Sequence, residues 1–155
     1  CRSPLGVNSG LINDSAMTVM DEEAIYLDSY PFYARLHRIM GMGAWCAPDN
    51  DTERILQIDL GQQKVVTGIA TQGRHLGYQD YVTSFNLEYS TDGNTWVNYT
   101  DNNSTVKVII FQGNQEQHEV VSHKLKKSIT ARFVRFHPLT WNNMPCLRVE
   151  LLGCE

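Results

Sequence analysis

The chain has 155 residues, of which 42% are hydrophobic and 19% charged, and its formal net charge is −4. These values predict one globular domain over residues 1–155, exclude wholesale disorder, and argue against nucleic acid as a partner. No apolar run approaches the roughly 18 residues that a transmembrane helix needs. The chain begins at a cysteine without a signal peptide, so we expect a mature or excised domain.

The first third of the chain carries few secondary-structure signals. Residues 17–19 are a short strand candidate. Residues 20–32 mix acidic, aromatic and aliphatic side chains, but Ser29 and Pro31 interrupt the only possible helical stripe. We therefore expect a long loop there.

From residue 56 onward, eight segments show the alternating or β-branched pattern of strands. Turn residues separate several of them: Gly61 ends the first, Asp92-Gly93 makes a tight hairpin, and Pro138 ends the seventh. The segments are 56–60, 64–71, 85–89, 96–99, 106–111, 119–123, 129–137 and 147–151. Because no convincing helix accompanies them, they predict an all-β sandwich or barrel.

The four cysteines indicate disulfides, with three formally possible pairings. Cys1 and Cys154 lie at the two ends of the chain, which suits a bond between the termini. That pairing leaves Cys46 with Cys146; the alternative is that these two are buried free thiols. A disulfide pattern predicts an oxidising, extracellular environment.

Five N-glycosylation sequons favour the same environment. They begin at Asn13, Asn50, Asn98, Asn102 and Asn103. Each alone is a weak match, but five beside a disulfide pattern predict a secreted or cell-surface glycoprotein.

Short motifs along the whole chain resemble, in order, those of the discoidin family, also called the coagulation factor V/VIII type C domain. They include Pro4-Leu5-Gly6, Ala34-Arg35-Leu36, Gly43-Ala44-Trp45, Thr71-Gln72-Gly73-Arg74, Phe111-Gln112-Gly113-Asn114, Ala131-Arg132-Phe133-Val134-Arg135 and the segment 147–154. The resemblance implies an eight-stranded antiparallel jelly-roll β-sandwich, or distorted barrel. It also implies a disulfide that joins the termini and ligand-binding loops at one end.

Two branches of the family share different parts of the sequence. The segments 43–46, 73–75 and 146–150 resemble the collagen-binding receptor kinases, in which the arginine matching Arg74 pairs with an acidic residue at the position of Met42. The first loop also lacks the tryptophan of those receptors. The segments 111–114 and 140–142 are instead similar to the coagulation-factor, milk-fat-globule and neuropilin branches.

The resemblance places three segments with apolar side chains at one end of the sandwich: the first loop (22–32), the second loop (37–46) and the third loop, which begins at Gly73. If exposed together, their apolar side chains would mark an interaction site; alternatively, they cover the open end of the barrel. The candidates are Ile25, Tyr26, Leu27, Ile39, Met40, Met42, Leu76 and Tyr78. We expect Tyr26, Leu27, Met40 and Tyr78 to be exposed.

Arg74 and His75 are expected at the rim of this patch. Arg74 can pair with a carboxylate of a ligand, or within the domain with Asp80 or Asp49. Arg35 and Trp45 are expected to be structural, because in the family they help to hold the loop ends.

The first loop is acidic, with Asp21, Glu22, Glu23 and Asp28. Clustered carboxylates can bind calcium, but a solvated acidic loop is the favoured interpretation, and these acids would repel phosphatidylserine. The sequence has no zinc-binding or catalytic motif, so we expect neither a metal site nor an enzyme.

The leading hypothesis is an extracellular adhesion module that binds a protein or a cell-surface glycan through the three loops. One alternative is a peripheral membrane protein that inserts Ile25, Leu27, Met40 and Leu76 into the lipid interface. Others are a lectin-like module and a collagen-binding domain like those of the receptor kinases.

Overall fold

The computed structural model describes residues 1–26, 28–100 and 107–154. In this part of the chain, no helix combines the length and apolar character needed to cross a membrane. The described residues include three single-turn 3₁₀ helices, η1 (Asp14–Ala16), η2 (Glu22–Ala24) and η3 (Pro31–Tyr33). The strands are β1 (Ser3–Pro4), β2 (Met17–Val19), β3 (Trp45–Cys46), β4 (Leu56–Gln72), β5 (Tyr81–Ser90), β6 (Val97–Asn98), β7 (Phe111–Gln112), β8 (Val121–Asn142) and β9 (Cys146–Cys154).

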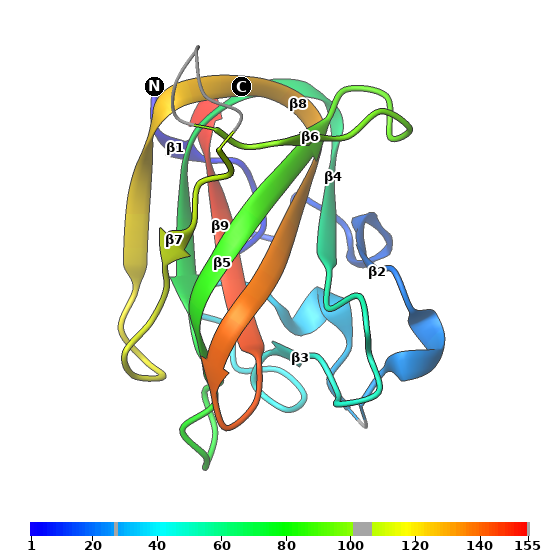
Figure 1. Ribbon diagram of the computed structural model, residues 1–155, viewed down its shortest axis with the longest axis vertical. Helices are drawn as coiled ribbons and strands as arrows, with labels where there is room; N and C mark the ends of the chain where they lie inside the picture. The colour runs from blue at the N-terminus through cyan, green and yellow to red at the C-terminus, as the bar shows by residue number, and fades with distance from the viewer. Residues whose placement is uncertain (27, 101–106, 155) are drawn as a thin grey trace.

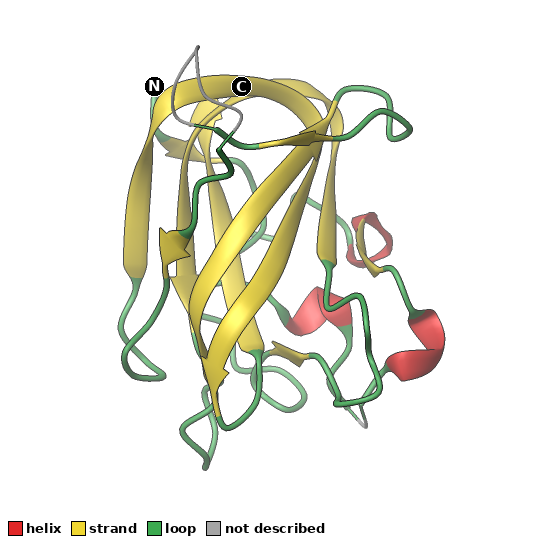
Figure 2. Cartoon of the chain, in the orientation of Figure 1, coloured by secondary structure: helices red, strands yellow, loops and turns green. Residues whose placement is uncertain are grey.

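The strands form one antiparallel sheet that folds over on itself. Its order is β1-β9-β4-β8-β5-β6, with β2 on β4, β3 on β9 and β7 on β5. The long strands β4 and β8 arch across the upper end of the molecule in Figure 1, so each contributes to both layers. The expected all-β jelly-roll architecture is confirmed, and Figure 2 shows loops gathered at the lower end.

The bends in β4 and β8 explain why the expected strand boundaries were partly wrong. Gly61 does not end a strand: it adopts φ +78° inside β4, where the register with β8 shifts between Asp59 and Lys64. The segments 56–60 and 64–71 are therefore two limbs of β4. The segments 119–123 and 129–137 are likewise two limbs of β8. Local alternation reports burial, but it does not distinguish a bulge from a turn.

Two further boundaries differ from expectation. Pro138 does not stop β8, which continues to Asn142; the proline lies opposite Phe85 beside a register shift, where the missing amide is tolerated. The strand expected at 106–111 begins only at Phe111, and Val106 lies outside the described residues.

The hydrophobic core lies between the two layers of the sheet. Two disulfides cross-link the chain around it. Phe85 stacks on Phe111 with ring centroids 5.4 Å apart. Cys1 pairs with Cys154 and Cys46 with Cys146, so both expected bonds are present. The first joins the termini, and the second fixes the end of the second loop to β9.

Candidate functional site

The three loops meet at the end of the barrel opposite the arch (Figure 1), and backbone hydrogen bonds join them. The Met42 amide donates to the Asp28 carbonyl at 3.1 Å, which links the second loop to the first. The His75 amide donates to the Gly43 carbonyl at 3.1 Å, which links the third loop to the second. We call the surface formed by 22–32, 37–46 and 73–80 the loop end.

Arg74 is held inside the loop end by two acceptors. Its Nη1 lies 3.0 Å from Asp80 Oδ2, and the Asp80 side chain is 1% exposed, so the expected internal ion pair is confirmed. Its Nε donates to the Met42 carbonyl at 2.7 Å. A backbone carbonyl therefore takes the place of the acidic residue that the sequence lacks at position 42. Arg74 therefore holds the third loop against the second through these two contacts.

The second loop turns sharply because two glycines adopt positive φ. Gly41 has φ +56°, and a Cβ there would lie 2.2 Å from the Tyr33 ring. Gly43 has φ +85°, and a Cβ there would approach the His75 amide nitrogen to 3.0 Å. Only glycine fits both the backbone conformation and the close approach of the neighbouring loops.

Large apolar side chains project from all three joined loops, and the most exposed of them lie on the second and third. Ile39 and Met40 of the second loop are 61% and 49% exposed, and Leu76 and Tyr78 of the third are 47% and 67% exposed. Tyr26 of the first loop is 37% exposed. The expected exposure of Tyr26, Met40 and Tyr78 is confirmed, so these side chains do not serve as a buried lid of the barrel.

Other members of the predicted patch are placed differently. Ile25 is half-buried and packs against the core, and Met42 is half-buried while its backbone joins the loops. His75 is half-buried, with its ring 5.6 Å from that of His118. Leu27 lies outside the described residues. The exposed patch is therefore concentrated on the second and third loops.

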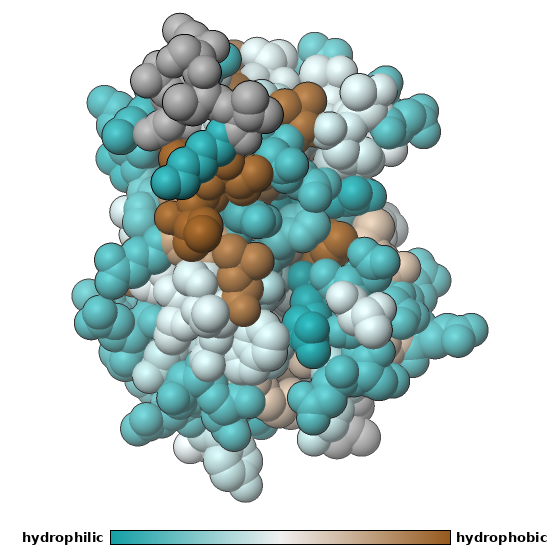
Figure 3. Space-filling view, in the orientation of Figure 1, coloured by the Kyte–Doolittle hydropathy of each residue, from teal (hydrophilic) through white to brown (hydrophobic). Residues whose placement is uncertain are grey.

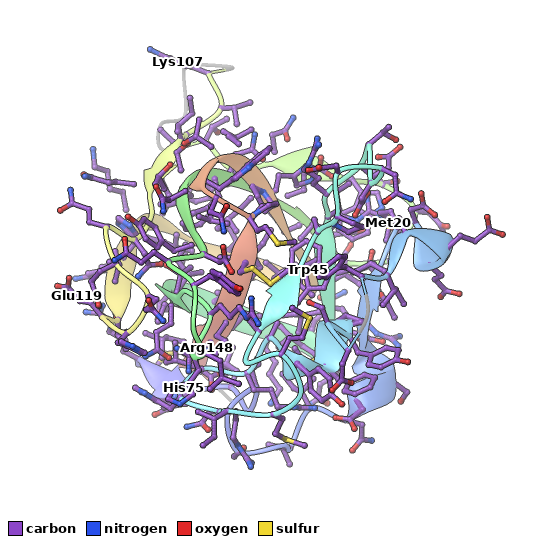
Figure 4. All side chains as sticks on the ribbon, turned by 90° about the horizontal axis from the view of Figure 1, so that it is seen from below. Met20, Trp45, His75, Lys107, Glu119 and Arg148 are labelled. Atoms are coloured by element: carbon purple, nitrogen blue, oxygen red, sulfur yellow. A yellow bond between two sulfur atoms is a disulfide. The ribbon has the colours of Figure 1, made fainter. Side chains whose placement is uncertain are left out.

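Arg148 is a buried cation beneath the loop end that sequence reasoning missed. It is 2% exposed and donates to the carbonyls of Gly73 at 2.7 Å, Arg38 at 3.0 Å and Gln117 at 3.3 Å. Among the described residues no carboxylate pairs with it, and burial lowers the pKa of its guanidinium. Figure 4 shows Arg148 and His75 on the same side of the barrel, away from Met20.

The sequence signal closest to Arg148 was an alternation of apolar and charged residues, in which Leu147, Val149 and Leu151 alternate with Arg148 and Glu150. This pattern predicts a strand with one solvated face, but both faces of β9 are buried here. Glu150 is also 2% exposed; its carboxylate accepts the amides of Val7 and Asn8 at 3.0 and 2.9 Å. Arg148 and Glu150 therefore hold neighbouring segments in place, Arg148 by hydrogen bonds to backbone carbonyls and Glu150 by hydrogen bonds from backbone amides.

Arg35 and Trp45 are structural, as expected. Arg35 is 5% exposed and donates to the Val7 carbonyl at 2.6 Å and to Asp14 at 2.7 Å. Trp45 is 2% exposed within the core.

The acidic residues of the first loop do not converge on one point. Asp21 caps η2 by accepting the Glu23 amide, and Asp28 accepts the Tyr33 hydroxyl at 3.3 Å. In the described ranges, no three His, Cys, Asp or Glu side chains come together as metal ligands. The calcium hypothesis therefore rests on the sequence alone.

Three of the five sequons lie on exposed positions. Asn13, Asn50 and Asn98 are solvent-exposed, whereas Asn102 and Asn103 lie outside the described residues. In a secretory host, we expect Asn13→Gln, Asn50→Gln and Asn98→Gln each to remove one glycan, measured as a mass shift before and after peptide N-glycosidase treatment. An unchanged mass for any one variant would show that its sequon is unused.

The fold and the joined loops define a β-sandwich module with one end built from loops. Residues 18–151 match the F5/8 type C domain, and the chain belongs to that family. Bos taurus lactadherin is 38% identical over 159 residues, which cover 99% of this chain and 37% of lactadherin. Bos taurus coagulation factor V is 37% identical over 158 residues, 100% of this chain and 7% of the factor.

A solved structure of Dictyostelium discoideum discoidin II has the same fold. It superposes with a TM-score of 0.80 at 24% sequence identity, covering 98% of this chain and 58% of that chain. This chain therefore spans little more than a third of the length of lactadherin and just over half of discoidin II.

Proposed function

We propose that the chain is a non-catalytic, extracellular recognition module that binds a protein partner through the loop end. The observation that carries this proposal is the joint exposure of Ile39, Met40, Leu76 and Tyr78 on two loops that are hydrogen-bonded to each other. Exposed apolar side chains grouped in this way mark interaction sites in otherwise polar surfaces. The two disulfides and the exposed sequons support an extracellular location.

The loops suit a binding surface because they are fixed before the partner arrives. Arg74, the glycine turns and the Cys46–Cys146 bond hold the backbone, so little conformational entropy is lost when Tyr78 and Met40 contact a partner. A protein partner fits better than a glycan, because three of the four exposed side chains are aliphatic or thioether groups rather than sugar-stacking rings.

Insertion into a membrane interface is a second candidate that one observation favours. Arg38 is exposed directly before Ile39 and Met40, so a cation lies next to the aliphatic tip of the second loop. Such a pair can place apolar atoms among lipid tails and a positive charge among anionic headgroups.

Replacing the tip of the third loop tests both candidates. We expect Leu76→Ser/Tyr78→Ser to weaken binding to cultured cells about a hundredfold, because two central anchors are lost. The melting temperature should not change, since both side chains are exposed. Flow cytometry with the labelled domain measures cell binding. Ile110→Ser is the matched control: Ile110 is 65% exposed and precedes β7, where Figure 3 shows an apolar patch on the side of the barrel.

Four further assays identify the class of partner. Loss of binding after trypsin treatment of the cells supports a protein partner, and loss after glycosidase treatment alone supports a glycan. Sedimentation with phosphatidylserine vesicles at low salt supports the membrane candidate, and binding to collagen-coated plates supports the collagen alternative. Full binding by Leu76→Ser/Tyr78→Ser in every arm would show that the loop end is not the site.

A further inference from the structure

An apolar groove lies between β2 and η3, on the side of the domain occupied by the first loop. Its volume is about 440 Å³. Met17, Val19 and Pro31 form a buried floor, and Ile25, Tyr30 and Phe32 form a wall. Figure 1 places β2 and η2 on the right of the barrel, whereas the third loop hangs at the lower left. We call this feature the β2–η3 groove; it is separate from the exposed tips of the second and third loops.

The wall of the groove is built from packed aromatic rings. Tyr30 and Phe32 stack with centroids 5.2 Å apart and an interplanar angle of 4°. Tyr33 packs edge-on against both, at 5.8 and 4.9 Å. Pro31, which lies between Tyr30 and Phe32 in the chain, begins η3 and restricts the backbone there. The groove is thus preformed, and Tyr30, at 39% exposed, presents its ring for contact.

One border of the groove is an edge strand. Within the described part of the chain, β2 pairs with β4 alone, through Met17–Ile58, Thr18–Gln57 and Val19–Leu56. The other edge of β2 is therefore not used by the sheet. Backbone groups on an open edge can hydrogen-bond to an added extended segment, while alternate side chains of that segment enter neighbouring pockets.

The charges that line the groove are all negative. Asp14 and Glu22 line it, and none of its ten lining residues is Lys, Arg or His. Asp14 is already paired with Arg35 at 2.7 Å. Among the described residues, the Glu22 carboxylate has no hydrogen-bond or ion-pair partner. The groove therefore offers an unpaired carboxylate beside an apolar floor and an aromatic ring.

We propose that the β2–η3 groove binds an extended segment of a partner protein in which an apolar side chain is followed by lysine or arginine. The segment adds to the open edge of β2. Its apolar side chain lies against Tyr30 and the floor formed by Met17 and Val19, and its cation pairs with Glu22. This is a second binding surface, separate from the exposed tips of the second and third loops that carry the proposed function.

Fluorescence anisotropy with two labelled heptapeptides tests the proposal on the intact domain. One peptide alternates lysine and valine, and the other replaces each lysine with glutamate. We expect the lysine peptide to bind and the glutamate peptide not to bind. Glu22→Lys should weaken binding about fivefold through the lost ion pair, and Tyr30→Ser about tenfold through the lost aromatic contact. Unchanged melting temperatures show that both variants remain folded.

Glu23→Lys is the matched control, because Glu23 is exposed on the same turn but does not line the groove. It should change the affinity less than twofold, and Leu76→Ser/Tyr78→Ser should leave it unchanged. Failure of the loop-end proposal would therefore not affect this result. Absence of binding by the lysine peptide, equal weakening by Glu22→Lys and Glu23→Lys, or no effect of Tyr30→Ser would each overturn the proposal.

Discussion

Replacing Arg148 with methionine is expected to lower the free energy of unfolding by about 3 kcal/mol, since three hydrogen bonds from a buried cation are lost and only part of that loss is offset by removing the buried charge. Methionine nearly fills the same space but leaves the carbonyls of Gly73, Arg38 and Gln117 without this donor. These carbonyls belong to three separate segments that support the loop end. The variant should therefore also weaken binding through the loop end.

Urea unfolding monitored by tryptophan fluorescence measures this loss. Arg38→Met is the control, because Arg38 comes from the same end but is exposed and donates to the Asn8 carbonyl at 2.9 Å. Removing that exposed bond should cost no more than about 0.5 kcal/mol. Equal stability of the two variants would contradict the assignment of Arg148 as the central support of the loops.

Removing the Cys46–Cys146 bond is expected to have the other large effect. The bond closes a separation of 100 residues, and the chain-entropy model assigns about 4 to 5 kcal/mol to a loop of that length. Cys46 also pairs with Cys146 in the β3–β9 ladder, at the point where the second loop joins the sheet. Cys46→Ala/Cys146→Ala should therefore lower stability and release the second loop, which weakens loop-end binding.

The Cys1–Cys154 bond provides the matched comparison. Its separation is 153 residues, so Cys1→Ala/Cys154→Ala should lower stability by a similar amount, about 5 kcal/mol. It joins the termini and does not contact the loop end, so binding by the folded fraction should be retained. Urea unfolding at low temperature and cell binding measured together separate the two effects. Equal loss of binding in both variants would show that the Cys46–Cys146 bond has no particular role in the loop end.

Some features of the candidate site could be predicted from the sequence, and others could not. The exposed positions of Met40 and Tyr78 were predictable from the family resemblance, which places their segments in loops at one end of the sandwich. The role of Met42 was not predictable, since its backbone carbonyl, rather than its side chain, meets Arg74. The β2–η3 groove could not be predicted from the sequence either, because Val19 and Tyr30 come together only when η3 packs on β2.

By itself, the sequence determined the all-β class, the family, the two cysteine pairs and the loops that carry exposed apolar side chains. The all-β class follows from local alternation and turn residues, whereas the pairing of the cysteines and the position of the loops follow from the resemblance of short motifs to the family. Only the tertiary structure decided that β4 and β8 are continuous bent strands and that both faces of β9 are buried. It alone joined Arg148 to carbonyls as far as 110 residues away. A periodic pattern records which side chains avoid water, but their partners depend on packing between distant segments.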